Sequence, residues 1–186
     1  MGLGNPGPRY LATRHNVGFR TIGLVAQVLG VSLRRPWFRS YLLGRAAPDG
    51  RPLRLVQPLT YMNRSGVILP ALRPLAGNGS LLVVCDTLDL PPGHCRLRRG
   101  GSSAGHKGLA SVIAELGRAD FLRLYIGIGR PSRQEEVVDY VLGCPSGAEA
   151  ELLERGVEKA AEAVLALLHE EPEKVMNALN QAPQQP

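Results

Sequence analysis

The strongest constraint on the fold is an apolar run that ends abruptly at an aspartate. Residues 81–84 are all apolar, which is typical of a strand buried in a sheet. Two prolines and a glycine at 91–93 end that strand. Asp86 is therefore expected at the C-terminal end of a central strand, where open α/β sheets bind ligands. Two interpretations stay open: Asp86 caps a turn, or it orients a histidine from far upstream, His15.

The rest of the chain alternates between strand and helix patterns. Apolar, β-branched and aromatic residues predict strands at 37–43, 53–56, 94–99 and 121–129, and the turn residues Pro48-Asp49-Gly50 predict that the first two form a hairpin. Amphipathic patterns predict helices at 16–30, 67–75, 109–116 and, interrupted by Pro172, along 146–179. The stretch 137–142 is ambiguous in type. A chain of 186 residues is expected to form one domain, at 1–181, followed by a disordered tail at 182–186.

Polar residues at helix starts offer caps and one candidate base. Thr13 or Asn16 is expected to cap the first helix, and Ser65 the second. His15 lies at the start of the first helix, beside arginines. A helix N-terminus and nearby cations disfavour the imidazolium, so we expect His15 to stay neutral and able to accept a proton. A structural role for this histidine is the alternative.

Composition excludes several classes of protein. No apolar run approaches the roughly 20 residues needed to cross a bilayer, so no membrane partner is expected. The first residues show no signal-peptide pattern. The cysteines Cys85, Cys95 and Cys144 form no CxxC pair, which argues against a disulfide framework or a zinc site. These features favour a reducing, cytoplasmic compartment and predict no metal.

The charge is distributed unevenly along the chain. Residues 1–100 carry 14 Lys+Arg and 3 Asp, whereas residues 101–186 carry 8 Lys+Arg and 13 Asp+Glu. Arginine supplies nearly all of the cations, and its planar guanidinium suits bidentate contact with phosphate. The basic half therefore predicts an anionic partner, with a nucleic acid as the first choice. A basic surface without a specific partner is the alternative.

The first turn matches a dinucleotide-binding pattern only in its letters. Residues 2–7, Gly-Leu-Gly-Asn-Pro-Gly, fit GxGxxG. That motif needs a preceding strand and an acid about 20 residues later, but only Met1 precedes it and the first acid is Asp49. A nicotinamide-dependent enzyme is therefore disfavoured. The same observation predicts that the first strand of the sheet is missing from this chain.

A glycine-rich loop follows the predicted strand at 94–99. Arg96 and Arg98 lie on one face of that strand, because side chains alternate with period two. The Gly/Ser-rich stretch 100–108 then leads into a helix and contains Lys107. Such a loop can present backbone N–H groups to phosphate; a flexible linker is the alternative. The amide of Asn63, in an earlier polar loop, can donate and accept, or it is an ordinary loop residue.

Six short motifs occur in order along the chain. They are Gly-Leu-Gly-Asn-Pro-Gly at 2–7 with Tyr10, Thr13-Arg14-His15-Asn16-Val17-Gly18, Met62-Asn63-x-Ser65-Gly66, Asp86-x-Leu88-Asp89-Leu90-Pro91, Gly105-His106-x-Gly108, and Ile126-Gly127-Ile128-Gly129-Arg130-Pro131. No single motif is sufficient, but their order and spacing from Gly2 to about Gly143 resemble the bacterial-type peptidyl-tRNA hydrolase family.

The resemblance implies a fold, a reaction and a substrate. The implied fold is a monomeric, single-domain α/β protein with a mixed, mostly parallel sheet flanked by helices. The implied reaction is hydrolysis of the ester between a peptide and the 3′ end of tRNA, with no cofactor or metal. The expected partner is therefore peptidyl-tRNA, and the hydrolysis would return free tRNA to translation.

The resemblance also assigns site residues by motif. It implies that His15 is the general base and Asp86 its partner. The residues expected to bind the substrate are Asn5, Tyr10, Met62, Asn63, His106 and Lys107. The residues expected to contact tRNA phosphate are Arg96 and Arg98. An ester needs only a water activated by a neutral imidazole, with the carboxylate fixing the tautomer, so this assignment agrees with the residue chemistry.

Four features depart from the family pattern. Lys107 replaces the usual asparagine, Tyr125 stands where many members have an arginine, and Cys85 and Thr87 flank Asp86 in place of the commoner residues. The missing first strand is the fourth. These departures motivate an alternative function, a catalytically weakened RNA-binding member of the same fold.

Overall fold

The computed structural model describes residues 1–76, 80–131, 133 and 136–181. The strands are β1 (Tyr41–Ala46), β2 (Leu53–Pro58), β3 (Leu82–Thr87), β4 (Cys95–Arg99) and β5 (Leu122–Gly127). The α-helices are α1 (Val17–Val28), α2 (Leu69–Ala76), α3 (Lys107–Leu116), α4 (Val137–Leu142), α5 (Ala148–Ala166) and α6 (Pro172–Gln181). The short 3-10 helices are η1 (Pro8–Tyr10), η2 (Arg14–Asn16), η3 (Pro48–Gly50) and η4 (Met62–Ile68). The tail at 182–186, expected to be disordered, lies outside the described residues.

The strands form a mixed sheet and a hairpin. The three-stranded sheet has the order β3-β5-β4, in which β5 pairs parallel with β3 and antiparallel with β4. Strands β1 and β2 form an antiparallel hairpin, as the turn residues at 48–50 predict. The α/β class with a mixed sheet is therefore confirmed.

The expectation that the chain lacks its first strand holds only in part: no strand precedes β1 among the described residues, but residues 1–3 are hydrogen bonded to the sheet. The backbone N–H of Leu3 donates to the Val84 carbonyl at 2.9 Å, and the N–H of Gly2 donates to the Val56 carbonyl at 2.9 Å. Gly2 thereby forms a parallel bridge with Val84. Residues 1–3 thus occupy a strand position between β3 and β2, and they join the sheet to the hairpin.

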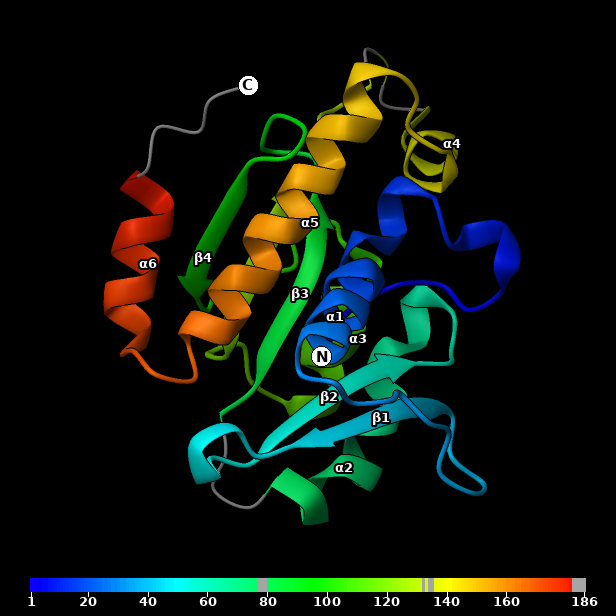
Figure 1. Ribbon diagram of the computed structural model, residues 1–186. Helices are drawn as coiled ribbons and strands as arrows, with labels where there is room; N and C mark the ends of the chain where they lie inside the picture. Colours follow the sequence, from blue (N-terminus) through cyan, green and yellow to red (C-terminus); the bar gives the residue numbers. More distant parts are fainter. Residues whose placement is uncertain (77–79, 132, 134–135, 182–186) are drawn as a thin grey trace.

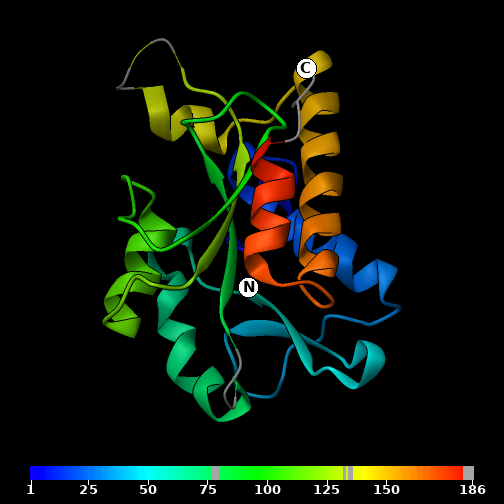
Figure 2. The ribbon, with the colours of Figure 1, turned by 90° about the vertical axis from the view of Figure 1, so that its left-hand side faces the viewer.

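Helices cover both faces of the sheet. Helices α1, α5 and α6 lie on one side, and α2 and α3 lie on the other (Figures 1 and 2). The alternation of side chains along β3 explains both layers, because Val84 belongs to the first core and its neighbours Val83 and Cys85 belong to the second. All three are fully buried, and burying one valine side chain contributes about 1.5–3 kcal/mol.

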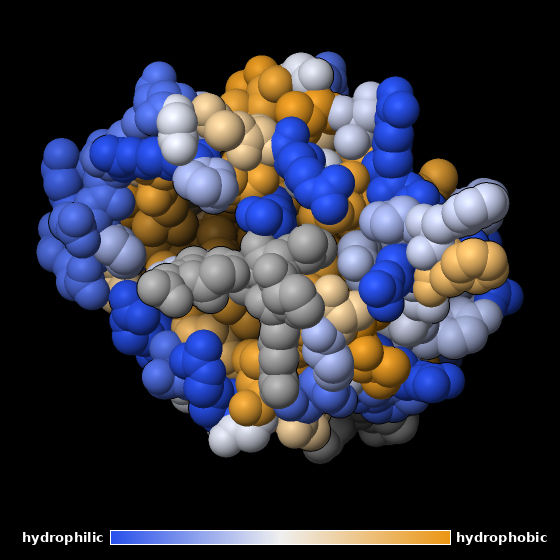
Figure 3. Space-filling view, turned by 90° about the horizontal axis from the view of Figure 1, so that it is seen from below, coloured by the Kyte–Doolittle hydropathy of each residue, from blue (hydrophilic) through white to orange (hydrophobic). Residues whose placement is uncertain are grey.

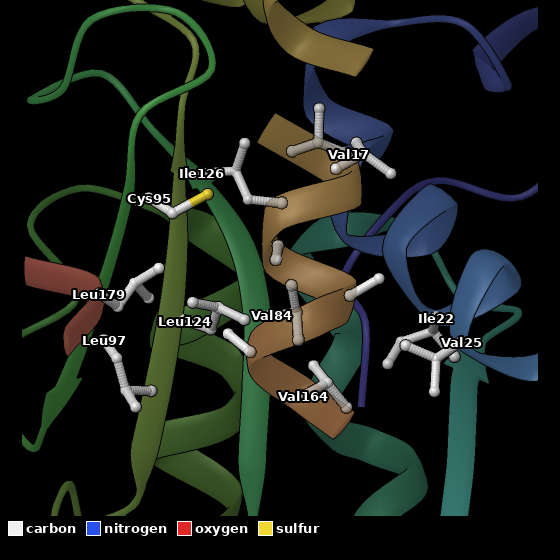
Figure 4. Close-up of a cluster of buried hydrophobic side chains, with 14 of the residues drawn as sticks. Val17, Ile22, Val25, Val84, Cys95, Leu97, Leu124, Ile126, Val164 and Leu179 are labelled. Carbon is white, nitrogen blue, oxygen red and sulfur yellow. The ribbon is translucent and has the colours of Figure 1, made fainter. Parts of the chain in front are cut away.

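The core on the α1/α5 side fills the space between the sheet and the helices. Figure 4 shows Val84, Leu124 and Ile126 of the strands facing Val164 of α5. This packing fixes the C-terminal ends of β3 and β5 relative to the helices around them.

Two predicted helix caps are wrong. Asn16 stands at the N-cap position of α1, but its side chain makes no capping hydrogen bond and binds the backbone of Asn5 instead. The Ser65 hydroxyl donates to the Met62 carbonyl within η4. Both polar side chains hold loops at the candidate site, because the loop backbone offers better placed partners than the helix ends do.

Candidate active site

A cleft of about 510 Å³ opens at the C-terminal ends of β3 and β5. Its walls come from the loop at 5–10, η2, η4, the loop before α3, and α4. Each of the ten residues proposed from sequence lines it: Asn5, Tyr10, His15, Met62, Asn63, Asp86, Arg96, Arg98, His106 and Lys107. The structure therefore gathers in one place residues that are up to 102 positions apart in the sequence.

At the base of the cleft, two histidines share one carboxylate oxygen. His15 Nδ1 lies 2.8 Å from Asp86 Oδ1, and His106 Nε2 lies 3.0 Å from the same oxygen. Asp86 is buried at the end of β3, and its placement there confirms the sequence prediction. Of the two interpretations, the one in which Asp86 meets His15 is the one that the structure shows.

The tautomers of both rings follow from their partners. Nδ1 of His106 accepts hydrogen bonds from the N–H groups of Gly108 and Leu109, so its Nε2 carries the proton and donates to Asp86. A carboxylate only accepts, so Nδ1 of His15 donates to Asp86 as well. Nε2 of His15 is left with a free lone pair, as a general base requires.

This geometry corrects one expectation about the loop before α3. The first free N–H groups of α3, which we expected to face phosphate, are used by the His106 ring. His15, Asp86 and His106 also place three ligand-type atoms within 4.8 Å of one another, as in a metal site. The proton on His106 Nε2 points at Asp86, so the arrangement is a hydrogen-bonded triad.

The pKa of His15 is shifted in the opposite direction from the one that the sequence suggested. Burial lowers the pKa of His15, but the charge and hydrogen bond of Asp86 raise it by more, so the net shift is upward. Lys107 opposes this effect and lowers the pKa of His15. The two histidines hold the pKa of Asp86 well below its usual range, although burial alone would raise it. The helix-based expectation of a depressed His15 pKa is therefore wrong, because the adjacent carboxylate dominates.

An asparagine pair positions Asn5 at the cleft. Asn16 Oδ1 accepts from the Asn5 backbone N–H at 2.8 Å, and Asn16 Nδ2 donates to the Asn5 carbonyl at 3.0 Å. The Asn5 side-chain oxygen accepts from the Met62 N–H at 2.8 Å. Its oxygen is thus committed to the protein, and its Nδ2 group is the part of the amide left to donate to a substrate.

Two further side chains hold the elements that carry the histidines. Arg14, beside His15, forms two hydrogen bonds of 2.6 Å with Glu149 of α5 and stacks over the Tyr140 ring of α4 at 4.3 Å. Arg123 of β5 is fully buried and donates to the carbonyls of Gly101, Ser102 and Ala119. The second arginine therefore fixes the glycine-rich loop that leads to His106.

Sequence reasoning missed some of these positioning residues. Asn16 was assigned to a helix cap, and Arg123 was hidden within a strand whose other residues are apolar. A charged residue in an otherwise apolar strand was the available signal, because a buried arginine needs acceptors. The α4 residues Val137 and Val141 also line the cleft, but their short stretch gave no clear type from sequence.

Cations surround the mouth of the cleft. Arg96 and Arg98 project from the exposed face of β4, as the period-two pattern predicted, and Lys107 is exposed at the start of α3. Tyr125 of β5 lines the same cleft. An imidazole with a free Nε2, an amide donor and three nearby cations form a set of groups that suits hydrolysis of an anionic substrate.

Comparisons with known proteins identify the family. The family model described as peptidyl-tRNA hydrolase matches residues 1–186, and the chain belongs to this family. It is 45% identical over 184 residues to the peptidyl-tRNA hydrolase of Bacillus subtilis strain 168, covering 96% of each chain. It is 41% identical over 182 residues to that of Syntrophotalea carbinolica, covering 97% of this chain and 95% of the relative.

Solved structures agree with the fold. The crystal structure of peptidyl-tRNA hydrolase from Acinetobacter baumannii superposes with a TM-score of 0.91 at 34% identity, covering 99% of this chain and 94% of that one. A peptidyl-tRNA hydrolase in complex with N-propanol gives a TM-score of 0.90 at 35% identity, covering 97% of this chain and 92% of that one. The described helices include none that is long and apolar enough to span a membrane.

Proposed function

We propose that this protein hydrolyses peptidyl-tRNA by general-base catalysis at His15. The substrate follows from the family, all of whose named relatives above are peptidyl-tRNA hydrolases. The single observation that carries the mechanism is the shared Asp86 oxygen, which leaves Nε2 of His15 as the free acceptor in the cleft. None of the comparisons favours the alternative of a weakened RNA-binding member.

The reaction runs through a tetrahedral intermediate. Nε2 of His15 takes a proton from a water molecule, and the water oxygen forms a bond to the ester carbonyl carbon. Asp86 stabilises the imidazolium produced in this step. When the intermediate collapses, the bond to the 3′ oxygen of the tRNA breaks, and the imidazolium returns its proton to that oxygen. The products are a free tRNA and a peptide whose new carboxylic acid releases its proton to solvent and becomes a carboxylate.

Substrate contacts are assigned by position in the cleft. The Nδ2 group of Asn5 and the amide of Asn63 would hold the peptide carbonyl and the attacking water, and would stabilise the developing oxyanion. Tyr10 and Met62 would line the site of the peptide. His106 would act on the reaction through Asp86.

The cations would hold the nucleic acid. Arg96 and Arg98 lie on the exposed face of β4 and would contact tRNA phosphates, and Lys107 would contact the negatively charged 3′ end or the oxyanion. No residue in this scheme requires a cofactor. Because a single chain supplies the whole cleft, we also propose that the protein acts as a monomer, in the cytoplasm where peptidyl-tRNA arises.

The test is release of peptide from an N-blocked aminoacyl-tRNA by the wild-type protein and by His15→Ala. We expect the variant to lose at least 100-fold in kcat/KM, the scale of a general base, while tRNA binding persists. Asn63→Ala provides a comparison in which the base remains but one amide that would hold the substrate and the attacking water is lost. If His15→Ala turns over at the wild-type rate, the assignment of the base is wrong.

A further inference from the structure

The loop between α1 and β1 presents two aromatic rings to solvent. Trp37 is 89% exposed and Phe38 is 92% exposed. Their ring centroids lie 5.6 Å apart with an interplanar angle of 32°. Large apolar side chains are normally buried, so two adjacent exposed rings indicate a contact surface. Sequence analysis placed both in a strand, but β1 begins only at Tyr41.

The loop is held in this open shape by its own hydrogen bonds. Arg35 Nε donates to the Arg39 carbonyl at 2.7 Å, and the Arg39 N–H donates to the Pro36 carbonyl at 3.1 Å. Phe38 at the tip has a φ of 55°, which is unfavourable for a bulky residue. The fold therefore maintains a strained tip with the rings pointing outward, and such strain is concentrated at binding sites.

Arginines precede and follow the rings in the sequence, and some of them line a cavity beside the loop. Arg34, Arg35 and Arg45 line a cavity of about 260 Å³ together with Ser32, Pro36 and Leu43. Arg39 is exposed within the loop itself. Within the described residues none of these four arginines forms an ion pair, and the sequence has no acid before Asp49. Three guanidinium groups around one cavity favour a phosphate, because each can donate two parallel hydrogen bonds.

We propose that this aromatic–arginine loop, residues 34–39 with Arg45, binds unpaired nucleotides of RNA. A base would stack on the exposed faces of Trp37 or Phe38, and a backbone phosphate would lie in the arginine-lined cavity. RNA fits better than a lipid surface because the cations converge on one cavity and because just two rings protrude. A lipid surface would instead favour a flat basic face with several apolar anchors.

The site is separate from the hydrolytic cleft. The cavity beside the loop shares no lining residue with the cleft. The loop leads into β1, whereas the cleft lies at the ends of β3 and β5 near α4 (Figure 1). Figure 3 shows the lower face of the molecule, where strongly hydrophilic side chains surround scattered hydrophobic patches. The inference therefore goes beyond the proposed hydrolysis and stands without it.

Trp37 is the single tryptophan of the chain, so its fluorescence reports on this loop alone. The experiment titrates the full-length protein with a short oligoadenylate, which carries no carboxylic ester for the hydrolytic site. We expect saturable quenching at low ionic strength and an affinity that falls steeply with added salt. Quenching should persist in His15→Ala. The binding result therefore does not depend on whether the hydrolytic proposal is correct.

Two variants and a matched control sharpen the test. Phe38→Ala and Arg45→Ala should each weaken binding, the first by about tenfold, the scale of one lost stacking contact. Arg155→Ala removes an exposed arginine from α5 and should leave the affinity unchanged. All three side chains are exposed, so thermal unfolding should be unaffected.

Three results would overturn the proposal. The first is the absence of quenching at low salt. The second is a loss of affinity in Arg155→Ala as large as that in Arg45→Ala, which would mean that any lost positive charge weakens binding. The third is a response of Trp37 to phosphatidylglycerol vesicles but none to the oligonucleotide, which would make the loop a membrane contact.

Discussion

Oδ1 of Asp86 accepts a hydrogen bond from each of two histidines, and this sharing fixes the orientation of both rings. Nδ1 of His106 is occupied by the hydrogen bonds from the N–H groups of Gly108 and Leu109. Nε2 of His15 faces the cleft without such a partner among the described residues. His106 therefore holds the Asp86 carboxylate in place, and His15 offers the ring nitrogen that can take up a proton.

The pH dependence of hydrolysis should reveal this pairing. Because the pKa of His15 is raised, the neutral base is available only above a midpoint higher than the ordinary histidine value of about 6.5, so kcat/KM should rise with pH through that midpoint. In Asp86→Asn the burial of His15 is unopposed, so the midpoint should move to lower pH. The plateau should fall by about 100-fold or more, because the tautomer is no longer held. A pH–rate profile of both proteins that shows the same midpoint would contradict this account.

Lys107 shifts the pKa of His15 in the opposite direction from Asp86, and this shift can be tested separately. Its charge lowers the pKa of His15, so removing that charge in Lys107→Met should move the midpoint of the profile upward. Arg118→Met is the matched control, since Arg118 lies beyond the other end of α3 and is paired with Asp120. A midpoint that stays fixed in Lys107→Met, or that shifts equally in both variants, would show that Lys107 does not act on His15.

At the scale of elements, the site depends on how α3 begins. His106 is the N-cap of α3, accepts hydrogen bonds from two of its first N–H groups, and donates to Asp86 from the other side of the ring. One ring therefore joins the end of β3 to the start of α3. Gly108 is required behind it, because a Cβ there would lie 2.5 Å from the sulfur of Met62.

Substitutions at His106 should separate capping from catalysis. Asparagine can accept the two N–H hydrogen bonds but cannot also reach Asp86, whereas alanine can do neither. We expect His106→Ala to lose about 1 kcal/mol of unfolding free energy, and His106→Asn to keep most of it. Both should turn over about tenfold more slowly, the equivalent of one lost hydrogen bond to a charged group. Denaturant unfolding and kcat are to be measured for both variants. Equal losses of unfolding free energy in the two variants would refute this account.

The elements themselves were largely predictable from sequence, and their connections were not. The runs at 81–84 and 121–129 and the turn at 48–50 predicted β3, β5 and the hairpin, because buried strands and tight turns have local signatures. The pairing of His15 with Asp86 was one of two interpretations of the strand end, and the family motifs favoured it. The partners of Asn16, Ser65 and Arg123 could not be predicted, because a polar side chain binds whichever backbone the fold brings near it.

For the whole molecule, the uneven charge governs how an anionic substrate arrives. The cations of the first hundred residues include Arg96 and Arg98 at the cleft, whereas the acidic excess lies in the second half. A basic patch of this kind accelerates encounter with a polyanion and makes it sensitive to salt.

The salt dependence of substrate binding measures that patch. We expect the affinity for tRNA to fall linearly on a log–log plot against salt, and Arg98→Ala to reduce the slope by about 1. Arg155→Ala, on α5, should leave the slope unchanged. If Arg98→Ala lowers the affinity equally at all salt concentrations, Arg98 does not contact a phosphate.

The strand position taken by residues 1–3 has a consequence for synthesis on the ribosome. Leu3 is hydrogen bonded to Val84, Asn5 to Met62, and Arg14 to Glu149, so the first residues made must wait for partners made much later. At about 5–20 residues per second, residue 3 remains unpaired for roughly 4–16 s. The cleft can be completed only after α4, which forms one of its walls, has emerged, so the hydrolytic site should form late in synthesis.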